Sequence, residues 1–218
     1  MSDFIPNVEF DPSNPDPRCA CLLVLDSSFS MRGEPIKQLN LGLQTFQSEL
    51  QKDAVAQSRV EIAIITFGPV TVATDFTPAR DFVAPTLKAK GNTPMGAALD
   101  HAIDMIAQRK QLYRTNGVPY YRPWIFLISD GAPTDAWKTV AKRIKAEEQK
   151  QSLSVFAVGV AGADMATLAE LSVRKPLPLQ GYSFREMFMW LSNSLVSVSQ
   201  SQPGQQVQLA PPASWTAL

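Results

Sequence analysis

Short apolar runs separated by longer stretches of mixed polarity dominate the pattern of this chain. Several of the runs are almost continuously apolar, which is typical of strands that are covered on both faces of a sheet. The predicted strands are CACLLVL at 19–25, VEIAIITF at 60–67, VTVATDF at 70–76, WIFLIS at 124–129, SLSVFAVGV at 152–160 and a short last one at 177–179. Only Gly68 and Pro69 separate the second strand from the third, which predicts a hairpin to an edge strand.

Between the strands, apolar residues recur at spacings of three and four, as on the buried face of a helix. The predicted helices cover residues 35–50, 95–112, 135–150, 164–173 and 184–198, and Asp135 is expected to cap the third of them. Strands that alternate with helices require right-handed crossovers. We therefore expect a doubly wound α/β fold, with a mostly parallel central sheet, one antiparallel edge strand and helices on both faces.

The ends of the chain differ from this regular pattern. Residues 1–17 carry four prolines and are expected to form an extended segment, because proline interrupts helices. Residues 199–218 are rich in Gln, Pro and Ser, a composition that does not form a packed core alone. We therefore expect a single domain at 18–198, followed by a tail.

Composition and charge exclude several classes of function. The 20 basic and 20 acidic residues cancel, so no broad positive field attracts nucleic acid or an anionic membrane. The first residues do not resemble a signal peptide, and no apolar run approaches the roughly 18 residues of a membrane span. These observations favour the cytoplasm. There, Cys19 and Cys21 are expected to be small buried residues and not a disulfide.

Oxygen-bearing side chains follow three of the predicted elements. The first strand ends in Asp26-Ser27-Ser28-Phe29-Ser30, the loop before the second long helix reads Gly91-Asn92-Thr93-Pro94-Met95-Gly96, and WIFLIS ends in Ser129-Asp130-Gly131. Ligands of doubly wound sheets gather at the carboxyl ends of the strands. A set of two carboxylates and three hydroxyls suits a hard cation such as Mg²⁺, although Ca²⁺ and Mn²⁺ also fit. The predicted metal ligands are Asp26, Ser28, Ser30, Thr93 and Asp130.

The sequence offers little support for catalysis, so we expect the protein not to be an enzyme. The single histidine, His101, lies within a predicted helix, and the motifs GxSxG and GxxxxGK[ST] are absent. One alternative is a metal-dependent phosphohydrolase that uses Asp26 as its nucleophile, but position 28 is a serine where such an enzyme would normally have a second acid. Another alternative is a metal-independent scaffold that docks through its tail. The Arg- and Tyr-rich loop at 109–124 is expected on the face opposite the metal site.

The DxSxS sequence after an apolar strand, the threonine loop and the later aspartate together resemble the metal-ion-dependent adhesion site (MIDAS) of von Willebrand factor A (vWA) domains. The resemblance covers about residues 18–198. It implies that Ser28 and Ser30 bind the metal directly, that Asp26 and Asp130 bind mostly through water, and that Thr93 joins or leaves the direct ligands. It also implies a protein-binding function, in which an acidic side chain of a partner completes the octahedron. The family commonly has glycine at the position of Phe29, so this benzyl group must point either into the sheet edge or over the metal.

A narrower resemblance rests on LLVLDSSFSMRGEPIKQLNLGLQTFQSEL, ITF, GNTPMGAAL and FLISDGAPTD. These segments resemble the bacterial TerY-like subgroup of vWA proteins, which is associated with tellurite resistance and stress-response operons. This resemblance implies a cytoplasmic protein with a protein kinase and a phosphatase among its partners.

Overall fold

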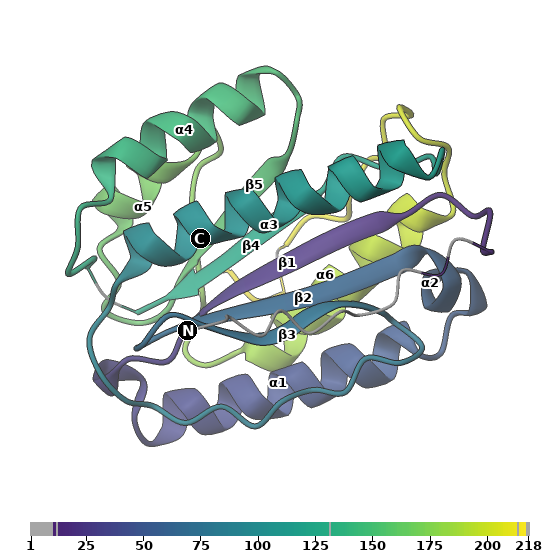
Figure 1. Cartoon of the computed structure of the whole chain (residues 1–218). Coiled ribbons are helices and arrows are strands. Elements are labelled where there is room, and N and C mark those ends of the chain that lie inside the picture. The colour runs from purple at the N-terminus through teal and green to yellow at the C-terminus, as the bar shows by residue number, and fades with distance from the viewer. Residues whose placement is uncertain (1–10, 12, 131, 213, 217–218) are drawn as a thin grey trace, which may run out of the picture.

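A twisted six-stranded sheet with helices on both faces forms the centre of the chain (Figure 1). The computed structural model describes residues 11, 13–130, 132–212 and 214–216. The strands lie in the order β3-β2-β1-β4-β5-β6. Their bounds are β1 Cys19–Asp26, β2 Val60–Phe67, β3 Thr71–Pro78, β4 Trp124–Ser129, β5 Ser154–Gly159 and β6 Leu177–Pro178. All neighbouring strands pair in parallel except β2 and β3, which are antiparallel. The predicted doubly wound fold with one antiparallel edge strand is confirmed.

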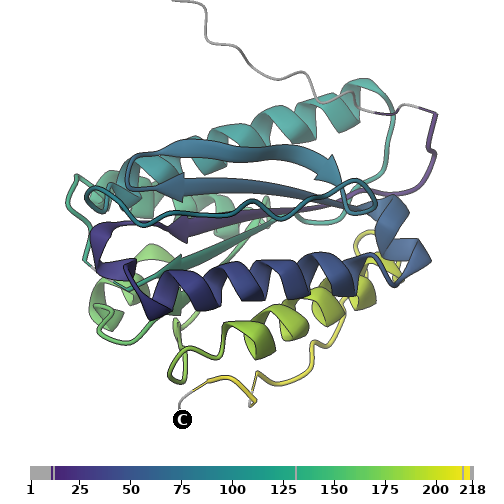
Figure 2. The ribbon, with the colours of Figure 1, turned by 90° about the horizontal axis from the view of Figure 1, so that it is seen from below.

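Two layers of helices cover the sheet. The helices are α1 Glu34–Leu50, α2 Ala54–Arg59, α3 Met95–Thr115, α4 Lys138–Gln149, α5 Met165–Leu171 and α6 Phe184–Ser199, with a short 3₁₀ turn, η1, at Phe29–Met31. Figures 1 and 2 show α1 and α6 side by side on one face, with α3, α4 and α5 on the other. Side chains of β1 alternate between the two cores: Leu23 packs towards α1 and α6, and Leu22 towards α3. This alternation explains why the strand is apolar at every position.

The order of the strands determines where a ligand can bind. The chain leaves β1 for β2 and β3 on one side and returns to β4, β5 and β6 on the other. The carboxyl ends of β1 and β4 are therefore neighbours at the point where the winding reverses, which is where ligands bind in doubly wound folds. Asp26 ends β1 and Asp130 follows β4, so both predicted acids lie at this edge.

Asp135 does not cap the helix that follows it, and this prediction was wrong. Helix α4 begins at Lys138, and Trp137 precedes it without a side-chain cap. The carboxylate of Asp135 instead accepts the backbone N–H groups of Gly96 and Ala97, at 2.9 and 2.8 Å, in the first turn of α3. The carboxylate thus caps the free backbone amides of α3, a helix distant in sequence, because the loop after β4 lies beside the start of α3.

The segment after α6 lies against the domain. The Trp190 indole donates to the Ala210 carbonyl at 2.7 Å, and Thr216 forms a bridge with Leu179. Trp215 is fully buried beside Trp190, with ring centroids 5.5 Å apart. Of the predicted N-terminal segment 1–17, residues 1–10 and 12 lie outside the described part of the chain.

The two cysteines and the loop before β4 lie where the sequence predicts them. Cys19 and Cys21 are buried and unpaired, and burial raises the pKa of the Cys19 thiol to about 12. The loop between α3 and β4 lies at the amino ends of the strands, because its Pro119 carbonyl accepts the backbone N–H of Arg18 at 2.9 Å. This loop is therefore at the end of the sheet opposite Asp26. His101 is exposed on α3. No helix in the described part of the chain is long and apolar enough to cross a membrane.

Candidate metal centre

The carboxylate of Asp26 is fixed in place at the end of β1. It is fully buried, and its Oδ1 accepts the backbone N–H of Ser28 at 2.9 Å. Its Oδ2 accepts the hydroxyl of Ser129, the last residue of β4, at 2.6 Å. One acid therefore joins the ends of the two central parallel strands and shapes the loop that carries the serines. Ser129 was not among the predicted ligands, and its part in the site follows from its position beside Asp26.

A row of three side chains crosses from the β1 loop to the β4 loop. The hydroxyls of Ser28 and Ser30 lie 2.8 Å apart, and the Ser30 hydroxyl donates to Oδ1 of Asp130 at 2.7 Å. Ser28 is buried, Asp130 is half-buried and Ser30 is exposed, so the row leads from the interior to the surface. Four of the five predicted residues thus meet at one place. Gly131, which follows them in the sequence motif, lies outside the described residues.

Two acids, Asp26 and Asp130, lie close together at this edge. Burial raises the pKa of Asp130, and the nearby negative charge of Asp26 raises it further, whereas the hydrogen bond from Ser30 lowers it. Both acids face the same small region, which favours a bound cation. Among the described residues, no group of three or more His, Cys, Asp or Glu side chains is placed to hold a metal.

Thr93 lies on a third loop that is bonded to both of the others. Its carbonyl accepts the backbone N–H of Thr134 at 2.9 Å, and its own N–H donates to the Thr134 hydroxyl at 3.2 Å. Two residues earlier, the Gly91 carbonyl accepts the N–H of Phe29 at 3.0 Å. The Thr93 hydroxyl has no hydrogen-bond partner among the described residues, and the residue is only 7% exposed. The loop therefore brings a free hydroxyl to the same edge of the sheet.

Two glycines allow the loops to approach so closely. Gly68 and Gly91 both have positive φ, at 127° and 71°. A Cβ on Gly68 would lie 2.5 Å from the Lys90 carbonyl oxygen, and one on Gly91 would lie 2.8 Å from the Gly68 carbonyl oxygen. Only glycine fits this contact of backbone against backbone.

We expect Gly91→Ala to damage the site as well as the fold. The control is Gly117→Ala, because Gly117 has a similar φ of 66° but nothing within 4 Å of its added Cβ. Gly91→Ala should lower the free energy of unfolding by about 1–3 kcal/mol more than the control, because both variants share the unfavourable φ but only this one forces a Cβ against backbone. Urea unfolding measures the difference, and calorimetric titration with Mg²⁺ should show weaker binding for the Gly91 variant alone. Equal losses in both variants would mean that the close approach of the loops is unimportant.

Phe29 points outward from the metal loop. Its side chain is 53% exposed, and the Arg32 guanidinium carbon lies 4.9 Å from the centre of its ring. The ring thus does not pack into the sheet edge, which was one of the two expectations for a benzyl group at this position. It instead adds an aromatic surface beside the exposed Ser30.

The sequence that builds these loops matches a known protein family. A family model described as von Willebrand factor type A domain matches residues 22–187, well over half of the chain. The chain belongs to the von Willebrand factor type A domain family. No curated protein sequence matches this vWA chain significantly.

Solved structures show the same vWA fold. The pilus adhesin SpaC from Lactobacillus rhamnosus GG, in its open conformation, is similar with a TM-score of 0.67 and 12% identity, over 84% of this chain and 30% of the adhesin. Proximal thread matrix protein 1 from the mussel byssus, with a zinc-occupied MIDAS motif, is similar with a TM-score of 0.56 and 13% identity, over 83% of this chain and 48% of that protein. The chain spans less than half the length of either structure. At these identities the similarity establishes the fold alone.

Proposed function

We propose that this vWA domain binds one Mg²⁺ ion and uses it to hold an acidic side chain of a partner protein. The proposed ligands are Asp26, Ser28, Ser30, Thr93 and Asp130. The observation that carries the proposal is the row of oxygens from Ser28 through Ser30 to Asp130, which comes from two loops and reaches the surface at Ser30. A zinc-occupied MIDAS motif in a structure of the same fold is consistent with a divalent ion at this edge.

The spacing of the oxygens is compatible with a small ion. Mg²⁺ holds its oxygens at about 2.0–2.1 Å in an octahedron, so neighbouring ligands lie about 2.9 Å apart. The observed separations of 2.8 and 2.7 Å are ordinary hydrogen-bond lengths, and they are also close to that value. Ca²⁺ binds at about 2.3–2.6 Å and needs its oxygens further apart. The serines would therefore exchange their mutual hydrogen bonds for Mg²⁺ with little movement.

The hydrogen bonds of Asp26 support an indirect role for this acid. Protein donors from Ser28 and Ser129 already occupy both of its carboxylate oxygens. We propose that Asp26 acts on the metal mostly through water, and that its charge orients the loop. With direct carboxylate ligands so few, the bound ion keeps positive charge for an anionic group from outside.

The surface around Ser30 suits an acidic partner. Arg32 adds a positive charge beside the ring of Phe29, and the exposed Lys90 lies on the adjacent loop, where its backbone N–H donates to the Ser27 carbonyl at 2.7 Å. A partner carboxylate would reach the metal over the aromatic surface of Phe29. Apolar contact and charge attraction would then act together.

We propose a binding function and not catalysis. The alternative phosphohydrolase needs Asp26 as its nucleophile, but this carboxylate is buried and both of its oxygens accept hydrogen bonds. Burial and these two hydrogen bonds place the carboxylate poorly for attack on a phosphate ester, which supports the binding function. Turnover of p-nitrophenyl phosphate that disappears in Asp26→Asn would contradict this part of the proposal.

The proposed biological setting rests on the sequence resemblance. The segments that resemble the TerY-like subgroup lead us to propose a cytoplasmic role in a bacterial tellurite-resistance or stress-response system. A protein kinase and a phosphatase are the proposed partners.

Partner capture in the presence and absence of metal tests the proposal. The full chain is immobilised and exposed to an extract of its own cells with Mg²⁺ or with EDTA, alongside the Asp130→Ala variant. Bound proteins are then identified by mass spectrometry. We expect a kinase or phosphatase to be retained by the parent chain with Mg²⁺, and to be lost with EDTA or in the variant. Equal capture under all three conditions would favour the metal-independent scaffold, which docks through residues 199–218.

A further inference from the structure

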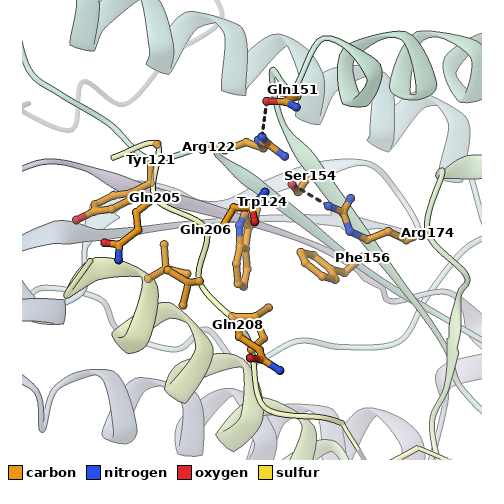
Figure 3. Close-up of a pocket in the computed structure, with 14 residues that line it drawn as sticks. Tyr121, Arg122, Trp124, Gln151, Ser154, Phe156, Arg174, Gln205, Gln206 and Gln208 are labelled. Carbon is orange, nitrogen blue, oxygen red and sulfur yellow. Dashed lines mark hydrogen bonds between the residues drawn. The ribbon is translucent and has the colours of Figure 1, made fainter. Parts of the chain in front are cut away.

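A cavity lies at the opposite end of the sheet from the candidate metal centre. It has a volume of about 860 Å³ and opens at the amino ends of β4 and β5 (Figure 3). Trp124 and Phe156 form its aromatic floor, with ring centroids 4.9 Å apart. Its walls are the side chains of Arg122 and Arg174 and the consecutive residues 204–209 of the segment after α6. None of the proposed metal ligands takes part.

The cavity carries a positive charge that the described residues do not neutralise. Arg122 is exposed and donates to the Gln151 side chain at 3.0 Å, and no carboxylate among the described residues pairs with it. Arg174 pairs with Glu148, and its guanidinium carbon lies 5.1 Å from the centre of the Phe156 ring. Glu148 neutralises the charge of Arg174 but not that of Arg122. The cavity as a whole therefore favours an anionic ligand.

The wall at 206–209 has the form of an unpaired strand. Val207 and Leu209 pack inward on the core, whereas Gln206 and Gln208 are exposed, so the side chains alternate as in a β-strand. No backbone hydrogen bond joins residues 206–209 to any other described residue. Both ends of the segment are held, by the bond of Gln205 N–H to the Gln202 carbonyl and by the bond of Trp190 to Ala210. This extended segment offers free N–H and C=O groups to a second chain.

The amino end of β5, beside the cavity, cannot pair with an added strand. The N–H of Val155 donates to a Glu148 carboxylate oxygen at 2.9 Å, and the Ser172 hydroxyl donates to the Val155 carbonyl at 3.2 Å. These side chains occupy the backbone groups through which another strand would join β5. An added strand would therefore pair with residues 206–209 and not with the sheet.

We propose that this cavity binds an extended acidic peptide segment of a partner protein. The peptide backbone pairs with residues 206–209, and a carboxylate of the peptide binds Arg122. The aromatic floor accepts the apolar side chains that alternate with the acidic ones. This site is independent of the metal centre and needs no cation.

The test is a binding titration of the full chain in EDTA, which removes any contribution of the metal site. The probe is a fluorescent peptide of alternating Glu and Val, N-acetylated and C-amidated, and anisotropy reports its binding. We expect Arg122→Gln to weaken binding roughly tenfold or more, as loss of a charge-assisted hydrogen bond does. The control Arg185→Gln removes an exposed arginine of α6 that does not line the cavity, and it should leave binding unchanged. An unchanged affinity for Arg122→Gln, or equal affinity for a peptide of alternating Gln and Val, would overturn the proposal.

A second pair of probes tests the backbone pairing. In an extended chain, successive N–H groups point in opposite directions, so only every other one can bond to residues 206–209. Peptides N-methylated on the Val amides or on the Glu amides should therefore differ, with one of them binding roughly tenfold or more weakly. If neither methylation weakens binding, or if free glutarate binds as tightly as the peptide, the site is one for small anions and the proposed strand pairing is wrong.

Discussion

The double variant Ser28→Ala/Ser30→Ala is expected to lose at least about 100-fold in Mg²⁺ affinity while it keeps its fold. Removal of even an indirect metal contact typically weakens binding by about 10–100-fold, and this variant removes two proposed direct ligands. The fold should survive because Ser30 is exposed and the two hydroxyls bond mainly to each other and to Asp130. Calorimetric titration with MgCl₂ measures the affinity, and circular dichroism confirms the fold.

Ser27→Ala is the matched control in the same loop. The Ser27 hydroxyl donates to the Phe67 carbonyl at 3.2 Å, away from the row of oxygens. We expect this variant to bind Mg²⁺ like the parent chain. Equal loss of affinity in the two variants would show that the loop, and not its ligands, determines binding.

The largest loss of stability is expected for Glu61→Ala. Glu61 lies within β2 and is 2% exposed. Arg18 lies 3.4 Å from one of its oxygens and Arg109 lies 2.7 Å from the other, while Tyr113 donates to it as well. Removal of the acid leaves two buried guanidinium groups without their carboxylate, which costs about 3–5 kcal/mol of the free energy of unfolding. Urea unfolding followed by circular dichroism measures this loss.

Arg143→Ala provides the comparison on the surface. Arg143 bridges Asp100 and Asp104 at 2.6 and 2.5 Å, but all three side chains are well exposed. Surface ion pairs contribute about 0–1 kcal/mol, so the variant should unfold almost like the parent chain. If Glu61→Ala lowers the free energy of unfolding no more than Arg143→Ala does, the buried ion pairs of Glu61 do not contribute to stability.

Strands buried on both faces made the fold predictable from the sequence. Continuous apolar runs such as 19–25 and 124–129 have few alternative structures, and their alternation with amphipathic stretches leaves little choice of topology. Because the carboxyl ends of parallel strands meet at one edge, the same pattern placed Asp26 and Asp130 together. Site and fold were therefore predicted by the same reasoning.

Contacts between distant segments could not be predicted in this way. Glu61 occurs in an otherwise apolar strand, and only its partners Arg18, just before β1, and Arg109, on α3, explain its burial. Asp135 was assigned to its own helix because no local pattern shows that the first turn of α3 lies beside it. Likewise, the Gln-rich composition after α6 concealed Trp215, which is fully buried against Trp190. In each case the decisive partner is far away in the sequence.

The sequence also left the form of the metal loop open. At Phe29, where the family commonly has glycine, the sequence allowed a ring either in the sheet edge or over the metal, and the structure leaves the residue 53% exposed and out of the sheet edge. Thr93 shares no hydrogen bond with the other four predicted ligands.

A crystal soaked in Mn²⁺ and measured at the manganese absorption edge tests the central claim most directly. Mn²⁺ accepts the same oxygen ligands as Mg²⁺ and is located by its anomalous signal. We expect one strong peak at the carboxyl ends of β1 and β4, within bonding distance of the hydroxyls of Ser28 and Ser30. A peak elsewhere on the domain, or no peak at this edge, would contradict a metal-dependent function for these residues.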